Sequence, residues 1–336
     1  MTLIRIIYFL FAFCGTISQG LWIGPLNAEV ILIVDIPLLM MFIVGKNTLR
    51  KDPKSKKVLL AMQLYLLWTF VGLLFAFNKH DAFLDVITNV RAFLIMLAVY
   101  RYLNSKKDLE FFLLGIGCGL LFQGLVGVYQ WRIGYANLRF LGEMNFGWQS
   151  SGTFVHPNVY GLYLLLLTPL VYRLAFFIET KWKNIFLIIF LVGVTALFAA
   201  QSRACWLGFT GAMCIFGFYD LIRRRLLKTK MMKLWVIVGF LGIFGIIQYG
   251  YIITGRFADA EESMTAKRSS SRLSLAKDAV RIIGENLVWG VGPDNYSYFA
   301  SENTAGLRVV HCTYLLIAAE LGMPGIIFFL LMFFQV

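Results

Sequence analysis

Side chains that bind or transfer charge recur where apolar segments of the sequence begin or end. His156, His311 and Arg203 lie at such boundaries, and Arg272 begins an amphipathic segment of a polar connection. A guanidinium group is planar, permanently charged and able to hold phosphate oxygens through two parallel hydrogen bonds. An imidazole, with an ordinary pKa of about 6.5, accepts a proton at neutral pH. Together these residue types predict binding of a pyrophosphate and activation of a hydroxyl nucleophile.

Each of these residues, taken alone, also has a purely structural explanation. Arg203 can extend its charge to a membrane boundary, and Arg272 can lie on the solvated face of an amphipathic helix. His156 and the nearby Asn158 can cap the start of a helix, which Pro157 suits as a first-turn residue. The chemical interpretation therefore depends on the whole set and not on one member.

Three further charged residues lie inside or beside apolar segments. Arg91 is near the centre of one of them, where a charge costs at least about 2.5–3.5 kcal/mol, so we expect a partner or a watery cavity. Asp35 and Glu320 raise the same question. Glu320 follows His311 by nine residues, about half a turn out of phase on a helix, so the two need not share a site.

No nucleotide or metal motif accompanies these residues. The sequence has no phosphate-binding loop of the Gly-Lys-Ser/Thr type, no dinucleotide fingerprint and no Asp-x-Asp pair. Its three histidines lack metal-ligand spacing, and its five cysteines are isolated in or beside apolar segments, where packing explains them. We therefore expect neither a metal nor a cofactor.

The elements that must position the candidate residues are apolar helices. Of the 336 residues, 59% are hydrophobic and 15% are charged, and the mean hydropathy is +0.74. Soluble domains are about 45–50% apolar and about 25% charged, so most soluble classes are excluded, as is disorder. A membrane helix needs about 20 apolar residues. Such runs occur at 4–23, 27–45, 58–77, 83–100, 109–131, 157–178, 185–201, 204–222, 234–253 and 312–334.

These runs predict an all-α, polytopic transmembrane bundle of about ten spans. Basic residues crowd the connections after the second, fourth, sixth and eighth runs. With the N-terminal segment, these connections hold 19 of the 31 Lys and Arg residues but only five of the 18 acidic residues. The positive-inside rule therefore places them and the N-terminus in the cytoplasm. The net charge of +13 is thus a topology signal, and we expect no nucleic-acid partner.

The opposite, outer face receives two long connections, at about 132–156 and 254–311. The topology divides the chain into transmembrane helices 1–9 (1–253), a large periplasmic loop (254–311) and a tenth helix (312–336). Within the large loop, an apolar residue recurs at helical spacing between Arg272 and Ile283. The predicted stripe consists of Leu273, Ala276, Val280 and Ile283, with Ser269 to Ser271 as N-cap candidates and Gly284 as a stop. This pattern predicts an amphipathic helix over the bundle.

Five motifs follow one another along the chain. They are residues 152–158 (Gly-Thr-Phe-Val-His-Pro-Asn), 202–206 (Ser-Arg-Ala-Cys-Trp), 271–272 (Ser-Arg), 286–293 (Asn-Leu-Val-Trp-Gly-Val-Gly-Pro) and 311–325, which contains His-x-x-Tyr and Glu-x-Gly-x-x-Gly. In pattern and order the sequence resembles the bacterial O-antigen ligase and O-antigen polymerase family of membrane glycosyltransferases, with Asn-Leu at 286–287 in place of the usual Pro-Leu. The last two motifs are the more specific.

The resemblance implies a substrate and a fold. The donor is a glycan carried on undecaprenyl pyrophosphate, and the enzyme lies in the bacterial inner membrane with its active site facing the periplasm. The family has about twelve helices, so one or two C-terminal helices are expected to be missing here.

The resemblance also implies roles for individual residues. His311 would deprotonate the acceptor hydroxyl, which attacks the anomeric carbon and expels undecaprenyl pyrophosphate with inversion and without a metal. Arg203 and Arg272 would bind the pyrophosphate and stabilise its developing charge, with Arg91 assisting from below. The sugar or acceptor side would be formed by His156, Asn158 and Tyr314.

Several functions remain open within this class and beyond it. A ligase transfers the glycan to lipid A-core, a polymerase transfers it to another lipid-linked repeat, and a third branch glycosylates protein. We favour the ligase. A transporter or flippase for lipid-linked saccharide is the alternative from another class, with Arg91, Asp35 and Glu320 lining its pathway. The sequence shows no internal repeat, which argues against that alternative.

Overall fold

The structure is a computed structural model that describes residues 2–17, 20–23, 28–45, 53–103, 105–133, 149–154, 156–177, 181–224, 268–300, 310 and 312–334. Packing divides the chain into two compact units. Unit 1 consists of Met1–Val44 and Ser105–Gly255, and unit 2 consists of Gly45–Asn104 and Arg256–Val336. Both units are interrupted in sequence. The division predicted from the sequence, into residues 1–253, 254–311 and 312–336, describes membrane topology and not packing units, and it stays a prediction.

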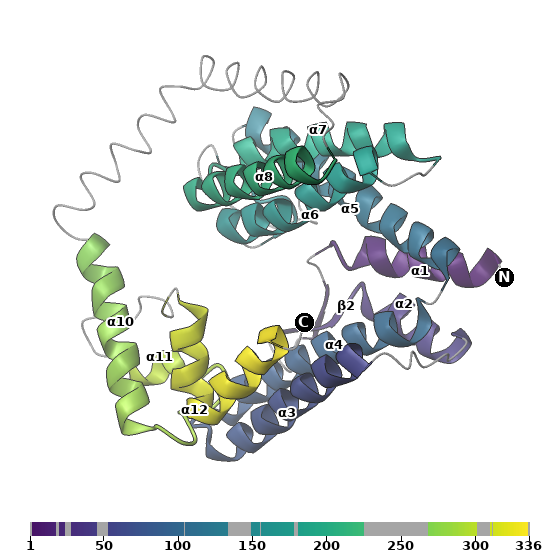
Figure 1. Ribbon diagram of the computed structural model, residues 1–336. Helices are drawn as coiled ribbons and strands as arrows, with labels where there is room; N and C mark the ends of the chain where they lie inside the picture. Colours follow the sequence, from purple (N-terminus) through teal and green to yellow (C-terminus); the bar gives the residue numbers. More distant parts are fainter. Residues whose placement is uncertain are drawn as a thin grey trace. The chain divides into compact units, whose positions relative to one another are not determined.

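The described elements are helices, apart from one hairpin (Figure 1). Unit 1 contains α1 (Thr2–Cys14), α2 (Asp35–Val44), α5 (Lys106–Ile133), α6 (Pro157–Phe177), α7 (Lys183–Ala199) and α8 (Arg203–Arg224). Unit 2 contains α3 (Pro53–Phe75), α4 (Lys79–Tyr102), α10 (Arg268–Glu285), α11 (Tyr296–Phe299) and α12 (Thr313–Phe334). Seven of the predicted apolar runs therefore correspond to helices of similar bounds.

The first two predicted runs are wrong as full-length helices. The chain leaves α1 after Cys14, and strand β1 (Gly20–Ile23) pairs antiparallel with strand β2 (Ala28–Leu32) before α2 begins. Both strands are rich in Ile, Leu, Val or Trp, and a short apolar run of this kind fits a strand as well as a helix. The Asp35 carboxylate accepts the backbone N–H of Leu32 at 2.8 Å and so joins β2 to α2.

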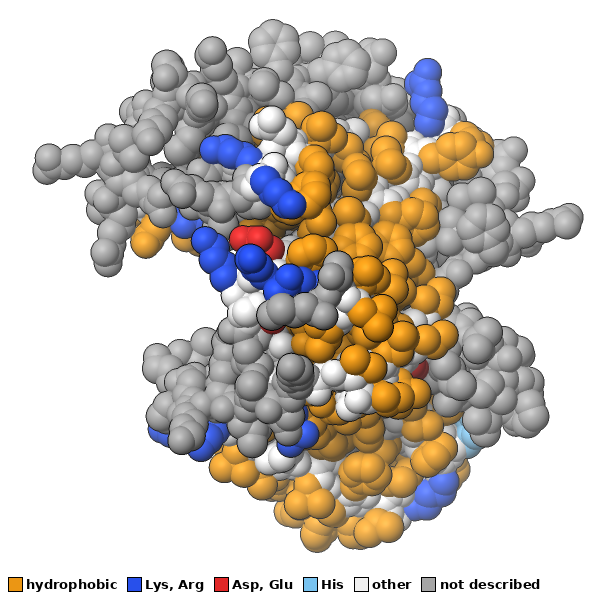
Figure 2. Space-filling model, turned by 90° about the vertical axis from the view of Figure 1, so that its right-hand side faces the viewer, with side chains coloured by type: hydrophobic (Ala, Val, Ile, Leu, Met, Phe, Trp, Pro, Cys, Tyr) orange, Lys and Arg blue, Asp and Glu red, His pale blue; other side chains and the backbone are white. Residues whose placement is uncertain are grey.

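Five of the described helices are long and apolar enough to cross a membrane. They span Lys56–Phe75, Lys79–Tyr102, Lys106–Ile133, Pro157–Ala175 and Thr313–Phe334. Large apolar side chains are exposed along them, and hydrophobic atoms cover much of the described surface in Figure 2. Such a surface suits lipid and not water. The chain is a multi-pass membrane protein; the total of about ten spans stays a prediction, and the run 234–253 lies outside the described residues.

Helix α5 is the centre of unit 1 because its glycines allow other helices to approach on two sides. A Cβ atom built on Gly115 would lie 2.3 Å from the carbonyl oxygen of Phe9 in α1, and one on Gly119 would meet Thr16 at 2.2 Å. The Gly115-x-x-x-Gly119 spacing therefore places two small residues where other parts of the chain come closest to α5. On another face, Gly117 and Gly124 pack against α7.

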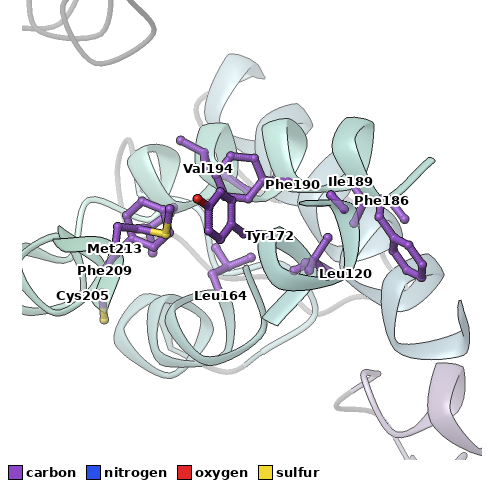
Figure 3. Close-up of a cluster of buried hydrophobic side chains, with 14 of the residues drawn as sticks. Leu120, Leu164, Tyr172, Phe186, Ile189, Phe190, Val194, Cys205, Phe209 and Met213 are labelled. Atoms are coloured by element: carbon purple, nitrogen blue, oxygen red, sulfur yellow. The ribbon is translucent and has the colours of Figure 1, made fainter. Parts of the chain in front are cut away.

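The core of unit 1 is formed where α5, α6, α7 and α8 meet. Figure 3 shows Tyr172 of α6 among Leu164, Phe190 and Val194, all fully buried. The rings of Tyr172 and Phe190 lie 5.6 Å apart at a tilted angle. The same cluster includes Tyr160 of α6 and Cys205 of α8, near the starts of the two helices, where three of the candidate residues lie.

Unit 2 packs α3 against α4 and α12, and packs α10 against the first half of α12 (Figure 1). The predicted amphipathic helix exists, but it is longer than expected, and its buried face matches the predicted stripe only in part. It begins at Arg268, so Ser269 to Ser271 lie inside it, and it continues through Gly284. Leu275, Ala279 and Ile282 are buried and Ile283 of the predicted stripe packs beside them, whereas Val280 of that stripe is exposed. The helix packs against the protein at that face, which shifts the buried stripe.

Candidate functional site

Two buried glutamines of α5 hold the segment that precedes α6. The Gln130 side-chain oxygen accepts the backbone N–H groups of Ser151 and Gly152, and its amide nitrogen donates to the Gly152 carbonyl oxygen at 2.7 Å. Gln123 accepts the N–H of Thr153 and donates to its hydroxyl oxygen. Gly152 has a φ of 59°, a conformation that suits glycine. Hydrogen bonds from α5 therefore fix the position of the Gly-Thr pair of the first motif.

His156 caps the start of α6. Its Nδ1 atom accepts the N–H of Asn158 at 3.1 Å, and its carbonyl oxygen accepts the N–H groups of Val159 and Tyr160. Pro157 occupies the first helical position, which needs no N–H donor. His156 therefore has the structural role of a helix cap. The side chain of Asn158 is exposed at the same end of α6.

Arg203 is the first residue of α8, and its side chain is partly buried. The α7 helix ends in a tight turn in which Gln201 has a φ of 50°. After the turn, the backbone N–H of Trp206 donates to Ser202 O, and its indole N–H donates to the carbonyl oxygen of Leu197 at 2.8 Å. The Ser-Arg-x-x-Trp pattern therefore closes the turn between α7 and α8.

The starts of α6 and α8 lie together within unit 1. Cys205 donates a weak hydrogen bond to the carbonyl oxygen of Asn158 at 4.0 Å. A Cβ atom on Gly161 would lie 2.9 Å from the Cys205 sulfur and 3.2 Å from Ser202 Cβ. The structure thus brings the first two motifs, which carry His156, Asn158 and Arg203, to one end of this unit.

The last two motifs meet within unit 2. Helix α12 is broken at Gly322, where φ is 66° and ψ is −172°, a conformation open essentially to glycine alone. The N–H of Val291 donates to Ala319 O at 3.0 Å, and the N–H of Gly292 donates to Glu320 O at 2.9 Å. Below the break, the N–H of Met323 donates to Leu287 O at 2.8 Å. The segment 286–295 therefore satisfies the backbone groups that the break frees, as a membrane-spanning helix requires.

The glycines of both motifs are needed for this contact. A Cβ atom on Gly290, which has a φ of 68°, would lie 2.2 Å from the carbonyl oxygen of Glu320. One on Gly322 would lie 2.2 Å from the carbonyl oxygen of Val288. The indole of Trp289 stacks on Trp68 at 5.4 Å and holds the same segment against α3.

Asparagine side chains fix the other end of this segment. The buried Asn295 accepts the N–H of Asn78 at 2.6 Å and donates to the carbonyl oxygens of Asn78 and Pro293. Asn78 in turn caps α4 through the N–H groups of His80 and Asp81. Nearby, burial raises the pKa of Asp294, and the negative charge of Asp81 raises that pKa further. The segment is therefore tied to α3, α4 and α12 together.

The remaining candidates are spread over unit 2. Arg272 lies in α10, and Tyr314 is an exposed residue in the first turn of α12, the helix against which α10 packs. Arg91 lies in the middle of α4, as predicted, and is partly buried. His311 lies outside the described residues. The roles assigned to all seven candidates stay predictions.

The described residues contain no group of three or more His, Cys, Asp or Glu side chains that could hold a metal ion. The polar groups found at the candidate positions are arginine, imidazole, amide and phenol. These groups can bind an anion and transfer a proton.

Sequence reasoning missed several residues that build this framework. Gln123 and Gln130 lie seven residues apart in an apolar run, which places them on one helix face. Polar side chains on one face of a membrane helix point to a partner inside the protein, so this signal was available. The contacts of Asn295 and Tyr296 had no comparable signal, because their partners are 217 and 24 residues away, respectively, or are backbone atoms.

Residues 188–330 of the chain match the family model described as O-antigen ligase. The comparisons with curated proteins and with solved structures found no match. The matched range contains Arg203, Arg272, Tyr314 and the position of His311. Arg91, His156 and Asn158 precede it, so their assignment depends on the sequence resemblance alone.

Proposed function

We propose, from the match of residues 188–330 to the O-antigen ligase family model, that this membrane protein is a glycosyltransferase of that family. It transfers a glycan from undecaprenyl pyrophosphate to an acceptor hydroxyl at the periplasmic face of the bacterial inner membrane. The observation that carries this proposal is the family match, which covers the motifs of His311, Arg203 and Arg272. The meeting of the glycine motifs 286–293 and 320–325 supports it, because the fold uses the sequence features that the resemblance names.

In the proposed reaction, His311 accepts the proton of the acceptor hydroxyl. The hydroxyl oxygen forms a bond to the anomeric carbon, and the bond from that carbon to the pyrophosphate oxygen breaks. The electron pair leaves with undecaprenyl pyrophosphate, and the configuration inverts. Arg203 and Arg272 bind the pyrophosphate oxygens and stabilise the charge that develops there, and Arg91 assists them.

His156, Asn158 and Tyr314 are proposed to contact the sugar or the acceptor. An amide, an imidazole and a phenol offer donors and acceptors that match sugar hydroxyls. The reaction needs no metal and no cofactor in this account, because the lipid pyrophosphate is already an activated leaving group.

The acceptor we favour is lipid A-core, which makes the protein an O-antigen ligase in lipopolysaccharide biosynthesis. A polymerase of the same family, which uses a second lipid-linked repeat as acceptor, is the alternative. Neighbouring genes discriminate between the two. A lipopolysaccharide-core cluster favours the ligase, and a flippase with a chain-length regulator favours the polymerase.

A leaflet assay tests the enzyme against a transporter. Cells that lack the protein are expected to accumulate lipid-linked glycan on the outer leaflet, because the donor is no longer consumed there. Accumulation on the inner leaflet would instead support a flippase. Purified protein in vesicles with a synthetic lipid-linked donor and a defined acceptor then reports which acceptor is used.

A further inference from the structure

Within unit 2, an acidic side chain and a phenol connect α12 to α10. The Glu320 carboxylate accepts the backbone N–H of Tyr296 at 3.2 Å. The Tyr296 hydroxyl donates to the carbonyl oxygen of Leu275 in α10 at 2.9 Å. Tyr296 is almost fully buried, so both of its contacts are shielded from water.

The connection ends one helical turn from a proposed substrate-binding residue. Leu275 follows Arg272 by three residues, which is within the 3.6 residues of one α-helical turn. Leu275 also belongs to the buried face through which α10 packs, together with Ala279 and Ile282. The position of this turn of α10 therefore depends on the hydroxyl of Tyr296 as well as on apolar packing.

Glu320 makes a second contact that fixes its own position. Its carbonyl oxygen accepts the N–H of Gly292, directly above the break of α12 at Gly322. Its side chain and its backbone thus hold the two ends of residues 292–296. Glu320 therefore links the first half of α12 to the segment that connects α10 with α11. A change in the direction of that half of α12 would move the segment with it.

We propose that Glu320 and Tyr296 are positioning residues that hold the Arg272 turn of α10 at a fixed place against α12. The inference rests on the proposed function, because Arg272 is a pyrophosphate-binding residue only in that account. A fixed arginine matters in such a site, since a misplacement of about 1 Å can reduce a rate about 100-fold. Glu320 acts here only as an acceptor, so an amide oxygen can replace its carboxylate.

The test uses the full chain in vesicles with a synthetic undecaprenyl-pyrophosphate-linked saccharide as donor. Four variants are compared: Glu320→Ala, Glu320→Gln, Tyr296→Phe and the control Tyr298→Phe. Tyr298 lies in the same short helix α11, but its hydroxyl donates to Asp81 and does not reach α10. Amide hydrogen exchange in residues 272–280 and the values of kcat and KM are measured for each variant.

Glu320→Ala and Tyr296→Phe are expected to increase exchange in residues 272–280 and to lower kcat by about tenfold or more, with a smaller change in KM. Glu320→Gln is expected to restore both quantities, and Tyr298→Phe to change neither. Unchanged exchange and kcat in Glu320→Ala would overturn the inference, as would a Glu320→Gln variant as impaired as Glu320→Ala, because the carboxylate charge would then be essential.

The two proposals fail in different ways. Transfer by the wild-type chain with unaltered kinetics in every variant would contradict the positioning role alone. No transfer by the wild-type chain, with acceptors of each class supplied, would contradict the proposed function and with it the role of Arg272.

Discussion

The backbone N–H of Gly292 donates a hydrogen bond of 2.9 Å to the carbonyl oxygen of Glu320, 28 residues further along the chain. This contact joins two glycine motifs that are far apart in sequence. It satisfies a carbonyl group that has no helical donor, because the residue four positions later is Pro324, which lacks an N–H. The two motifs can approach this closely only because Gly290 and Gly322 have no side chain where the backbones meet.

Replacement of Gly322 by alanine is expected to destabilise the protein strongly. The new Cβ atom would lie 2.2 Å from Val288 O, and the φ of 66° is unfavourable for alanine. Strain of this kind costs on the order of 1–3 kcal/mol before the clash is counted. The midpoint of thermal unfolding in detergent measures the effect. Gly284→Ala is the control, because nothing lies within 4 Å of its Cβ position, and it should be neutral or stabilising. Equal midpoints for the two variants would contradict the close contact at Gly322.

Replacement of Gly115 by alanine is expected to separate α1 from α5. Its Cβ atom would lie 2.3 Å from Phe9 O and 2.8 Å from Ala12 Cβ, and overpacking of this kind typically costs about 1–3 kcal/mol. Gly211→Ala in α8 is the matched control, since no atom lies within 4 Å of its Cβ position. Thermal unfolding of both variants gives the comparison. A Gly115→Ala protein as stable as the control would show that the helices do not touch there.

Replacement of Gln130 by leucine is expected to loosen the segment before α6. The change leaves two buried N–H groups and one buried carbonyl without their partner, at roughly 1–3 kcal/mol for each unsatisfied group. Hydrogen exchange at Ser151 and Gly152 should increase along with the loss of stability. Gln63→Leu, on an exposed position of α3, is the control and should leave that exchange unchanged. Retained protection in Gln130→Leu would mean that other groups hold the segment.

The stability of the protein is expected to depend on the ionisation of Asp294. Because partial burial raises its pKa above the ordinary value of 3.8, the folded state binds this proton more tightly than the unfolded state does. Its contribution is complete below pH 3.8 and is lost as the pH rises through the raised value. Asp294→Asn keeps a residue that tolerates the φ of 50° and should flatten this part of the stability profile.

Thermal unfolding measured from about pH 4 upward checks this pH dependence. Glu285→Gln, which removes an acidic group at the end of α10, is the control and should retain the wild-type slope. A slope that is the same in Asp294→Asn and in the wild type would exclude Asp294 as its source.

The sequence predicted the long helices well because a continuous apolar run of about 20 residues has few other solutions. It failed at residues 20–32, where the apolar run is interrupted by a hairpin, since hydropathy does not separate a strand from a helix. It also misplaced part of the buried face of α10. That face is set by the residues that α12 presents to Leu275, Ala279 and Ile282, and this partner surface is not visible in a local pattern.

The candidate site could be predicted only in part, for a similar reason. Arginine and histidine at helix ends can be recognised from the sequence as groups that bind anions or accept protons. The order of their motifs along the chain can be read from the sequence as well. The contacts of Gln130 with the Gly152 backbone and of Glu320 with the Tyr296 backbone involve atoms that every residue carries. Such contacts depend on the geometry of the folded chain and do not require a particular side chain at the partner residue.

The most direct test of the account is glycan transfer by the His311→Ala and Arg203→Ala variants. Each variant is placed in membranes at the wild-type level, with proper insertion checked, and is supplied with undecaprenyl-pyrophosphate-linked glycan and acceptor. The account predicts that both variants lose transfer, by about 100-fold or more for His311→Ala, while the lipid-linked donor accumulates on the outer leaflet. Normal transfer by properly inserted variants would contradict the assignment of these residues and the proposed mechanism.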